Sequence, residues 1–221
     1  MTSSAEPLLA VLASRARGLA RGGRRAVLGI TGAPGSGKTT FADALAARLR
    51  STGREVARVP MDGFHLADDE LSRLGRLDRK GAPDTFDTAG YASLLGRCSA
   101  TDGEVVYAPS FDRRVGQPIA GSIPVPPSAE LLITEGNYLL FDGEWARAGE
   151  FLTETWYVEV DEHGRRRRLV ARHVAFGKPA AAAREWAARV DQRNADLVAS
   201  YRHRADLVVD PDRGQAFRPG R

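Results

Sequence analysis

The amino-acid sequence predicts an α/β fold in which a central, mostly parallel sheet lies between helices on both faces. Three observations support this prediction. Short apolar runs recur along the chain, for example at 26–30 and 131–135, and helix-forming segments separate them. A glycine-rich loop joins the first apolar run to an alanine-rich helical segment at 41–50. Strands that alternate with helices form βαβ units, because parallel strands need crossover connections of that kind.

The glycine-rich loop matches the complete pattern G-x-x-x-x-G-K-[ST] of a phosphate-binding loop. Its glycines let backbone N–H groups turn inward around phosphate oxygens, and the helix that opens near Lys38 adds the positive end of its dipole. The Lys38 ammonium then reaches the β- and γ-phosphates, and the Thr39 hydroxyl takes a position on Mg²⁺. We therefore expect a bound nucleoside triphosphate. The expected nucleotide-binding residues are Gly32, Ala33, Pro34, Gly35, Ser36, Gly37, Lys38, Thr39 and Thr40.

The elements before and after this loop follow from patterning. Residues 4–21 place leucines on one helical face, which predicts an amphipathic helix beside the sheet. Gly22-Gly23 is expected to end this helix, which lies within an N-terminal region at 1–25. A second strand is expected at 55–60. The segment 61–66 then follows a strand end, which is where open α/β sheets bind ligands.

The rest of the chain completes a single domain, because 221 residues suffice for one sizeable core. Prolines and turn residues at 109–127 predict an excursion outside the core. A strongly basic helix is expected at 161–176, with Gly177 at its end. The other expected elements are a helix at 68–74, a loop at 79–87, a helix capped by Asp87 or Thr88, strands at 105–108, 131–135, 155–160 and 206–209, a helix at 179–203 and a loose tail at 211–221.

Composition restricts the partners and the compartment. The isoelectric point near 9.6 reflects 29 arginines and three lysines spread among 28 acidic residues. No basic tract interleaved with aromatics is present, so we do not expect a nucleic-acid partner. The apolar run 8–13 is too short to span a bilayer, and no membrane partner is expected. The single Cys98 excludes an intrachain disulfide and fits a reducing, cytoplasmic location.

Other motifs separate the classes of protein that use such a loop. The chain has no Asn-Lys-x-Asp motif for reading guanine and no Leu-Ser-Gly-Gly-Gln motif of transporter ATPases. The strand at 131–135 ends in Thr134-Glu135-Gly136 and lacks the Asp-Glu pair of ATPases that activate water. In place of these motifs, the chain has an acid, Asp62, directly after the second strand. It also has loops of the kind that hold a substrate and a basic helix late in the sequence.

These segments resemble a family, the P-loop small-molecule kinases related to uridine kinase, bacterial pantothenate kinase and phosphoribulokinase. Within it the series is most similar to a branch of fructose-transport-system or nucleoside/nucleotide kinases. The resemblance implies the P-loop NTPase three-layer αβα fold with a helical lid at 161–180. It also implies that ATP and Mg²⁺ are the cofactors and that the acceptor is a hydroxyl of a small molecule. The matching segments are 32–39, 61–65, 79–87, 107–113, 132–140 and 168–177.

The resemblance also implies roles for individual residues. Asp62 is the expected catalytic base, with capping of the following turn as the alternative. Glu135 is expected to help Thr39 hold Mg²⁺, directly or through water, with Asp62 beside them. Arg168 and Arg172, four residues apart on one helical face, are expected to stabilise the transferred charge. The other basic side chains of that helix are expected to be solvated, and a plain charged surface is the alternative for the whole run.

The acceptor pocket is expected to use aromatic rings, a histidine and polar groups from several loops. For any single ring a place in the core is the alternative, and His65 has a structural alternative as well. The 79–87 loop departs from the uridine-kinase pattern, so a pyrimidine acceptor is not assigned. The expected acceptor-binding residues are His65, Lys80, Asp84, Phe86, Tyr107, Phe111, Asp112, Arg113 and Tyr138.

The sequence therefore predicts an ATP- and Mg²⁺-dependent kinase that phosphorylates a nucleoside, a sugar or a pantothenate-like alcohol. Its partner is a small-molecule acceptor, and a homodimer is left open. A P-loop regulator or chaperone-type NTPase is the main alternative and predicts hydrolysis that is insensitive to any metabolite. A basic nucleic-acid-binding protein is the second and predicts salt-dependent binding.

Overall fold

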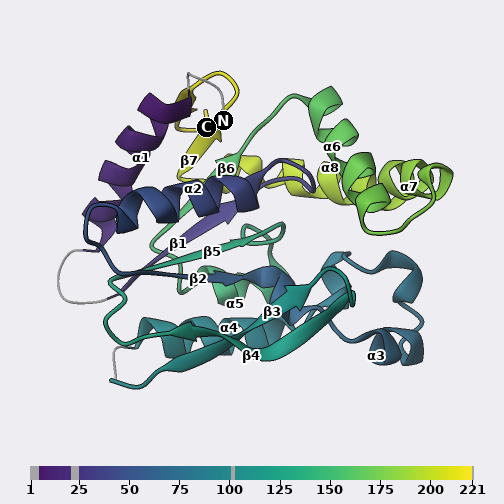
Figure 1. Cartoon of the computed structure of the whole chain (residues 1–221), viewed down its shortest axis with the longest axis horizontal. Coiled ribbons are helices and arrows are strands. Elements are labelled where there is room, and N and C mark those ends of the chain that lie inside the picture. Colours follow the sequence, from purple (N-terminus) through teal and green to yellow (C-terminus); the bar gives the residue numbers. More distant parts are fainter. Residues whose placement is uncertain (1–4, 21–24, 101–102, 221) are drawn as a thin grey trace.

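The computed structural model describes residues 5–20, 25–100 and 103–220. Six strands form one sheet in the order β2-β5-β1-β6-β7-β8, of which Figure 1 labels all but β8. The first five of these strands run parallel, and β8 pairs antiparallel with β7. The strands are β1 (Ala26–Thr31), β2 (Val56–Pro60), β5 (Leu131–Gly136), β6 (Glu154–Val158), β7 (Leu207–Asp210) and β8 (Gln215–Phe217). The predicted α/β fold, with helices on both faces of a mostly parallel sheet, is confirmed.

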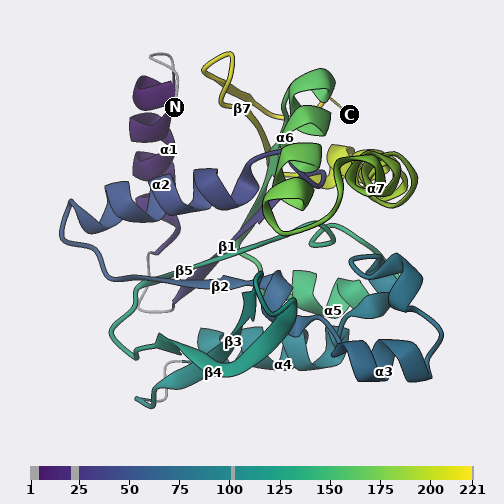
Figure 2. The same ribbon diagram turned by 45° about the vertical axis from the view of Figure 1, so that its right-hand side comes forward.

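Helices cover the two faces of the sheet and bury a core on each (Figures 1 and 2). On one face α1 (Ala5–Leu19) and α2 (Lys38–Arg50) pack against β1, β5, β6 and β7. On the other face lie α4 (Thr88–Ser99), which Asp87 caps by accepting from the Gly90 N–H, and α5 (Ala146–Gly149). Cys98 lies in the second core and is fully buried, and burial raises its pKa to about 11. The predicted end of the first helix at Gly22-Gly23 falls outside the described residues.

Trp156 on β6 is the largest side chain that the described core encloses completely. Its indole N–H donates to Glu154 Oε2 at 2.8 Å, so the ring is both packed and hydrogen-bonded. We expect Trp156→Ala to lower the free energy of unfolding by about 3–5 kcal/mol, because the change removes apolar contacts and leaves a cavity. Chemical denaturation would measure this change in the free energy of unfolding. Val11→Ala is the control, since Val11 is 67% exposed, and an equal loss in the two variants would contradict the expectation.

The segment 109–127 was predicted to be an excursion outside the core, and the structure differs from that prediction. It contributes to a two-stranded antiparallel ribbon of β3 (Val106–Asp112) and β4 (Gln117–Val125), with a bulge between Ala108 and Ser110. Val125, at the end of β4, is fully buried against the core. The prolines fit because a two-stranded ribbon has free edges, where a residue without an N–H loses no ladder hydrogen bond.

The C-terminal half also differs in detail. The helix expected at 179–203 is interrupted: α7 (Ala180–Trp186) continues into a π-helical segment (Ala187–Asp191), then α8 (Gln192–Ser200). The predicted loose tail contains β8, which adds the antiparallel edge to the sheet. The basic helix α6 (Glu162–Ala175) is capped by Asp161, whose carboxylate accepts from the N–H groups of His163 and Gly164. The remaining helix, α3 (Asp68–Arg73), lies beside the ribbon.

Candidate active site

The phosphate-binding loop connects β1 to α2, as predicted. Gly35 and Gly37 have φ angles of +79° and +86°, in the left-handed region that side chains disfavour. A Cβ on Gly35 would also lie 2.6 Å from Leu169 Cγ of α6, so the loop needs glycine there for a second reason. The Ser36 hydroxyl is buried and has no hydrogen-bond partner among the described residues. The loop therefore keeps polar groups available for an anionic ligand.

Helix α6 is attached to this loop by two arginines. Arg165 is 2% exposed and donates to the Pro34 carbonyl at 2.9 Å, and it also binds Glu162 and Gln192. Arg168 donates to the Gly35 carbonyl at 3.2 Å and does not line the cavity described below. The expectation that Arg165 would be solvated is wrong, since its guanidinium fills buried space between α6, the loop and α8. Arg168 is placed on the backbone of the loop, outside the cavity that Arg172 faces.

A cavity of about 480 Å³ opens beside the loop at the carboxyl ends of the central strands. Lys38 enters it from the start of α2, Asp62 from the turn after β2 and Arg172 from α6. Strand β5 lies between β1 and β2, and its Glu135 is in register with Ile30 and Pro60. This strand order brings the lysine of the loop and the two carboxylates into one cavity. Lys38 and Asp62 therefore share one cavity.

The charges in this cavity shift one another's proton affinity. Burial lowers the pKa of the Lys38 ammonium, and the negative charges of Glu135 and Asp62 act against that shift. For Asp62 burial acts upward, but electrostatic interactions with His65, Arg113, Lys38 and Arg172 outweigh it and hold its pKa below the ordinary value. The Arg113 guanidinium lies 3.2 Å from Asp62 Oδ2. Asp62 is consequently an ionised carboxylate at neutral pH.

Glu135 and Thr39 form the corner that would hold a metal ion. The Thr39 hydroxyl donates to Glu135 Oε1 at 3.0 Å, and Glu135 is 4% exposed. Burial raises the pKa of Glu135, and Lys38 opposes that shift. Among the described residues, no group of three or more His, Cys, Asp or Glu side chains could hold a metal. A hydroxyl with one or two carboxylates suits Mg²⁺ that completes its coordination with phosphate oxygens and water, so these residues fit that ion.

Arg58 on β2 was not identified from the sequence. Its guanidinium lies 4.0 Å from Glu135 Oε1 and pairs with Asp43 of α2. Its Nε is buried without a hydrogen-bond partner within the described part of the chain. The arginine thus connects α2 to the buried Glu135 from behind the cavity.

Five of the nine predicted acceptor residues line the cavity, namely His65, Lys80, Phe86, Phe111 and Arg113. The His65 ring packs 4.0 Å from the Phe86 ring and 4.7 Å from the Phe111 ring, measured between centroids. Its Nδ1 lies 2.8 Å from the Asp62 carbonyl oxygen, and burial lowers its pKa. Lys80 binds Asp68 and the Gly116 carbonyl, with its ammonium 5.4 Å from the Phe111 centroid.

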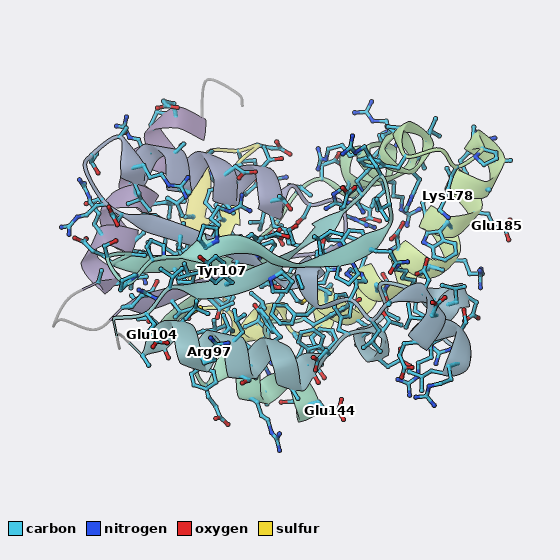
Figure 3. All side chains as sticks on the ribbon, turned by 60° about the horizontal axis from the view of Figure 1, so that its bottom comes forward. Arg97, Glu104, Tyr107, Glu144, Lys178 and Glu185 are labelled. Atoms are coloured by element: carbon cyan, nitrogen blue, oxygen red, sulfur yellow. The ribbon has the colours of Figure 1, made fainter. Side chains whose placement is uncertain are left out.

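The other four predicted acceptor residues do not line the cavity. Asp84 is exposed and pairs with Arg79 at 2.9 Å. Tyr107 is 59% exposed on the ribbon, and Figure 3 shows it well apart from Lys178, which lines the cavity. Asp112 accepts from the N–H groups of Arg114 and Val115 and so stabilises the turn of the ribbon. Tyr138 is fully buried, and its hydroxyl donates to the Gly81 carbonyl. The structure therefore gives Asp84, Asp112 and Tyr138 structural contacts and leaves the Tyr107 side chain exposed.

Several lining residues were not assigned a role from the sequence. Most of them come from α6, the connection after it, α7, the π-helical segment and α8, and no local pattern marks them. Only the position of His173 next to Arg172 was a usable signal. These residues are His173, Lys178, Trp186, Asp191 and Asn194, with Asn137 after β5 and Asp68 and Leu77 beyond β2.

A phosphate-binding loop on a parallel sheet, with a lysine, two carboxylates and arginines around one cavity, defines the chain as a P-loop nucleotide-binding enzyme. Comparisons with known proteins specify the family. A family model described as "Methylmalonyl Co-A mutase-associated GTPase MeaB" matches residues 3–65, the part that holds the loop. A Schizosaccharomyces pombe protein named "putative uridine kinase" is 35% identical over 173 residues, covering 75% of this chain and 74% of its own length.

Two further relatives support the same conclusion. A crystal structure from Silicibacter sp. TM1040, described as a "putative fructose transport system kinase", has 38% identity and a TM-score of 0.83, and covers 91% of this chain and 98% of its own. The pantothenate kinase of Lactococcus lactis is 30% identical over 149 residues, which are 60% of this chain and 48% of the relative. The chain belongs to the ATP-dependent P-loop small-molecule kinases that include the uridine and pantothenate kinases. Among the described residues, no helix has the length and apolar character needed to cross a membrane.

Proposed function

We propose that this protein transfers the γ-phosphoryl group of ATP to a hydroxyl of a small metabolite, with Mg²⁺ as the metal. The observation that carries the proposal is the common cavity of Lys38, Asp62 and Arg172. A kinase has to place the γ-phosphoryl group in line with an acceptor hydroxyl and neutralise the charge that develops. The cavity offers two cations for the phosphoryl oxygens and a carboxylate for the hydroxyl proton.

Each group has a distinct task in this proposal. The loop amides and Lys38 bind the triphosphate, and Arg172 approaches from α6 to stabilise the transferred charge. Thr39 and Glu135 would hold Mg²⁺, which supplies charge neutralisation when bound. Asp62 accepts the proton of the acceptor hydroxyl, and Arg113 keeps its carboxylate ionised and oriented.

The proposal is tested by measuring ADP release across nucleosides, sugars, sugar alcohols and pantothenate-like alcohols, with ATP and Mg²⁺. At least one compound is expected to raise ADP release well above the acceptor-free background, and Lys38→Met is expected to abolish the increase. If no hydroxyl compound raises the release, the kinase proposal is wrong. The match of residues 3–65 to a GTPase model makes GTP the second donor to test, and hydrolysis of either nucleotide without any metabolite effect would favour a regulatory NTPase.

The contact between Arg113 and Asp62 predicts a pH effect. Because the pKa of Asp62 is held below its ordinary value of 3.8, its carboxylate persists as pH falls, and turnover is lost only under strongly acidic conditions. Removing the cation in Arg113→Gln should raise that pKa, so the acidic fall of kcat/KM should move to higher pH. Arg114→Gln is the matched control, since the Arg114 side chain is 89% exposed. If kcat/KM fell at the same acidic pH in the two variants, the role assigned to Arg113 would be contradicted.

A further inference from the structure

One end of the cavity is built by residues without a role in phosphoryl transfer as proposed above. His173 reaches it from α6, Trp186 from the end of α7, Asp191 from the π-helical segment and Asn194 from α8. Single π-helical turns inside α-helices are rare and are frequent at functional sites. Here the π-helical segment is flanked by Trp186 and ends at Asp191, and both line the cavity.

Asp191 has an unused oxygen at this end. The residue is 7% exposed, and its Oδ2 lies 2.7 Å from His173 Nε2. Its Oδ1 has no hydrogen-bond partner among the residues that the structure describes. Because this oxygen is not enclosed by protein atoms, it can accept a hydrogen bond from a molecule in the cavity. An occupant of the cavity that donates to Oδ1 would therefore be favoured.

Asn194 adds a second acceptor atom on the same helical face, three residues further along the chain. It is 4% exposed, and its Nδ2 donates to the Gly81 carbonyl at 3.3 Å, which fixes the orientation of the amide. Its Oδ1 has no partner within the described part of the chain. These two acceptor oxygens are complementary to donor groups on the ligand, and hydroxyl groups supply them.

Most of the charged side chains around this end are already paired, but Arg172, assigned above to the transferred phosphoryl group, has no ion pair among the described residues. Lys80 pairs with Asp68, Arg113 with Asp62, and His173 with Asp191. Lys178 has no ion pair among the described residues, and its ammonium lies over the Trp186 ring, 4.4 Å from the centroid. The rest of the wall is formed by rings, those of His65, Phe86, Phe111 and Trp186. A sugar-like molecule would present hydroxyls to Asp191 and Asn194 and an apolar face to the rings, whereas an anionic group placed beside the Asp191 carboxylate would be repelled by it.

We propose that the acceptor is an uncharged molecule with several hydroxyl groups, a sugar or polyol, that donates hydrogen bonds to Asp191 Oδ1 and Asn194 Oδ1. Such a neutral acceptor is expected to be used more efficiently than a carboxylate- or phosphate-bearing one. The inference rests on the proposed kinase function. In the reaction, the acceptor oxygen forms a bond to the γ-phosphorus, the bond from that phosphorus to the β,γ-bridging oxygen breaks, ADP leaves with the electron pair, and the hydroxyl proton goes to Asp62.

The first test compares matched acceptors that differ in one ionised group, such as glycerol with glycerate, an aldose with its aldonate, and a polyol with its monophosphate. We expect kcat/KM for the best neutral compound to exceed that for its acid by at least about tenfold, the scale of one hydrogen bond or charge contact. If the protein prefers the acidic acceptor, this inference is wrong and the proposed kinase function is unaffected. Absence of acceptor-dependent ADP release for every pair overturns the proposed function, and this inference with it.

The second test is the variant Asp191→Asn, measured with the best neutral acceptor. The KM for the acceptor should rise about tenfold or more, while the KM for ATP and acceptor-free ATP hydrolysis stay the same. Asp196→Asn is the matched control, since this acid lies on the same helix, is exposed and accepts from Gln192 Nε2. An unchanged acceptor KM in Asp191→Asn overturns the inference. A parallel rise in the KM for ATP does so too, because it indicates a structural role.

A third variant tests the cation at this end. Lys178→Met should leave the ratio of kcat/KM for neutral and acidic acceptors unchanged, because the ammonium is engaged by Trp186. If the variant selectively loses activity toward an acidic acceptor that the unaltered protein prefers, Lys178 is an anion-binding residue and the inference fails.

Discussion

Replacing Asp62 by Asn is expected to lower kcat by about 10²–10⁴-fold, the usual contribution of a general base, while the KM for ATP changes little. Asparagine keeps the size of the side chain and an oxygen for Arg113, but it cannot take the acceptor proton. Asp62 lies on the turn Met61–Phe64, directly after β2, and shares the cavity with Lys38. Initial rates of ADP release at saturating acceptor measure the effect.

Asp69→Asn is a suitable control for that experiment, because Asp69 is an exposed acid on α3 outside the cavity. It should retain full turnover. If Asp62→Asn kept more than about a tenth of kcat, Asp62 would be a turn-capping residue, the alternative that its sequence position left open. Loss of nucleotide binding in the same variant would place its role in the metal site.

Replacing Arg172 by Met is expected to reduce kcat by as much as about 10³-fold, the lower end of the range for arginine fingers. Burial lowers the pKa of the Arg172 guanidinium, and the nearby cation of Arg113 acts in the same direction. Arg172 has no hydrogen bond or ion pair among the described residues, so a transferred phosphoryl group would supply the missing anion. Steady-state kinetics with ATP at saturation measure the loss.

Arg168→Met provides the matched comparison, because the sequence predicted the same role for both arginines. Arg168 donates to the Gly35 carbonyl and does not line the cavity. Without this hydrogen bond the phosphate-binding loop is held less firmly, so nucleotide binding should weaken modestly. The kcat should stay within about tenfold of the unaltered value. A larger loss of kcat in Arg168→Met than in Arg172→Met would reverse the assignment.

The features that the sequence determined are those encoded by short stretches of chain. The loop from Gly32 to Thr39 carries its own conformational requirements, since glycines supply the backbone angles and the following helix supplies the dipole. The alternation of apolar runs with helical segments was enough for the α/β class. Asp62 was identified from its place at a strand end, where ligands bind, together with the resemblance to the kinase family.

Tertiary structure decided which residues from distant segments meet. The insertion of β5 between β1 and β2 brings Glu135 to Thr39 and Arg58, and no local pattern encodes that strand order. The β3–β4 ribbon and β8 form by antiparallel pairing with the neighbouring strand in the chain, but their proline- and glycine-containing sequences resembled loops. The π-helical segment likewise turns Asp191 toward His173 through packing that a helical repeat does not reveal. The sequence thus determined the phosphate-binding chemistry, and long-range pairing and packing determined the acceptor end of the cavity.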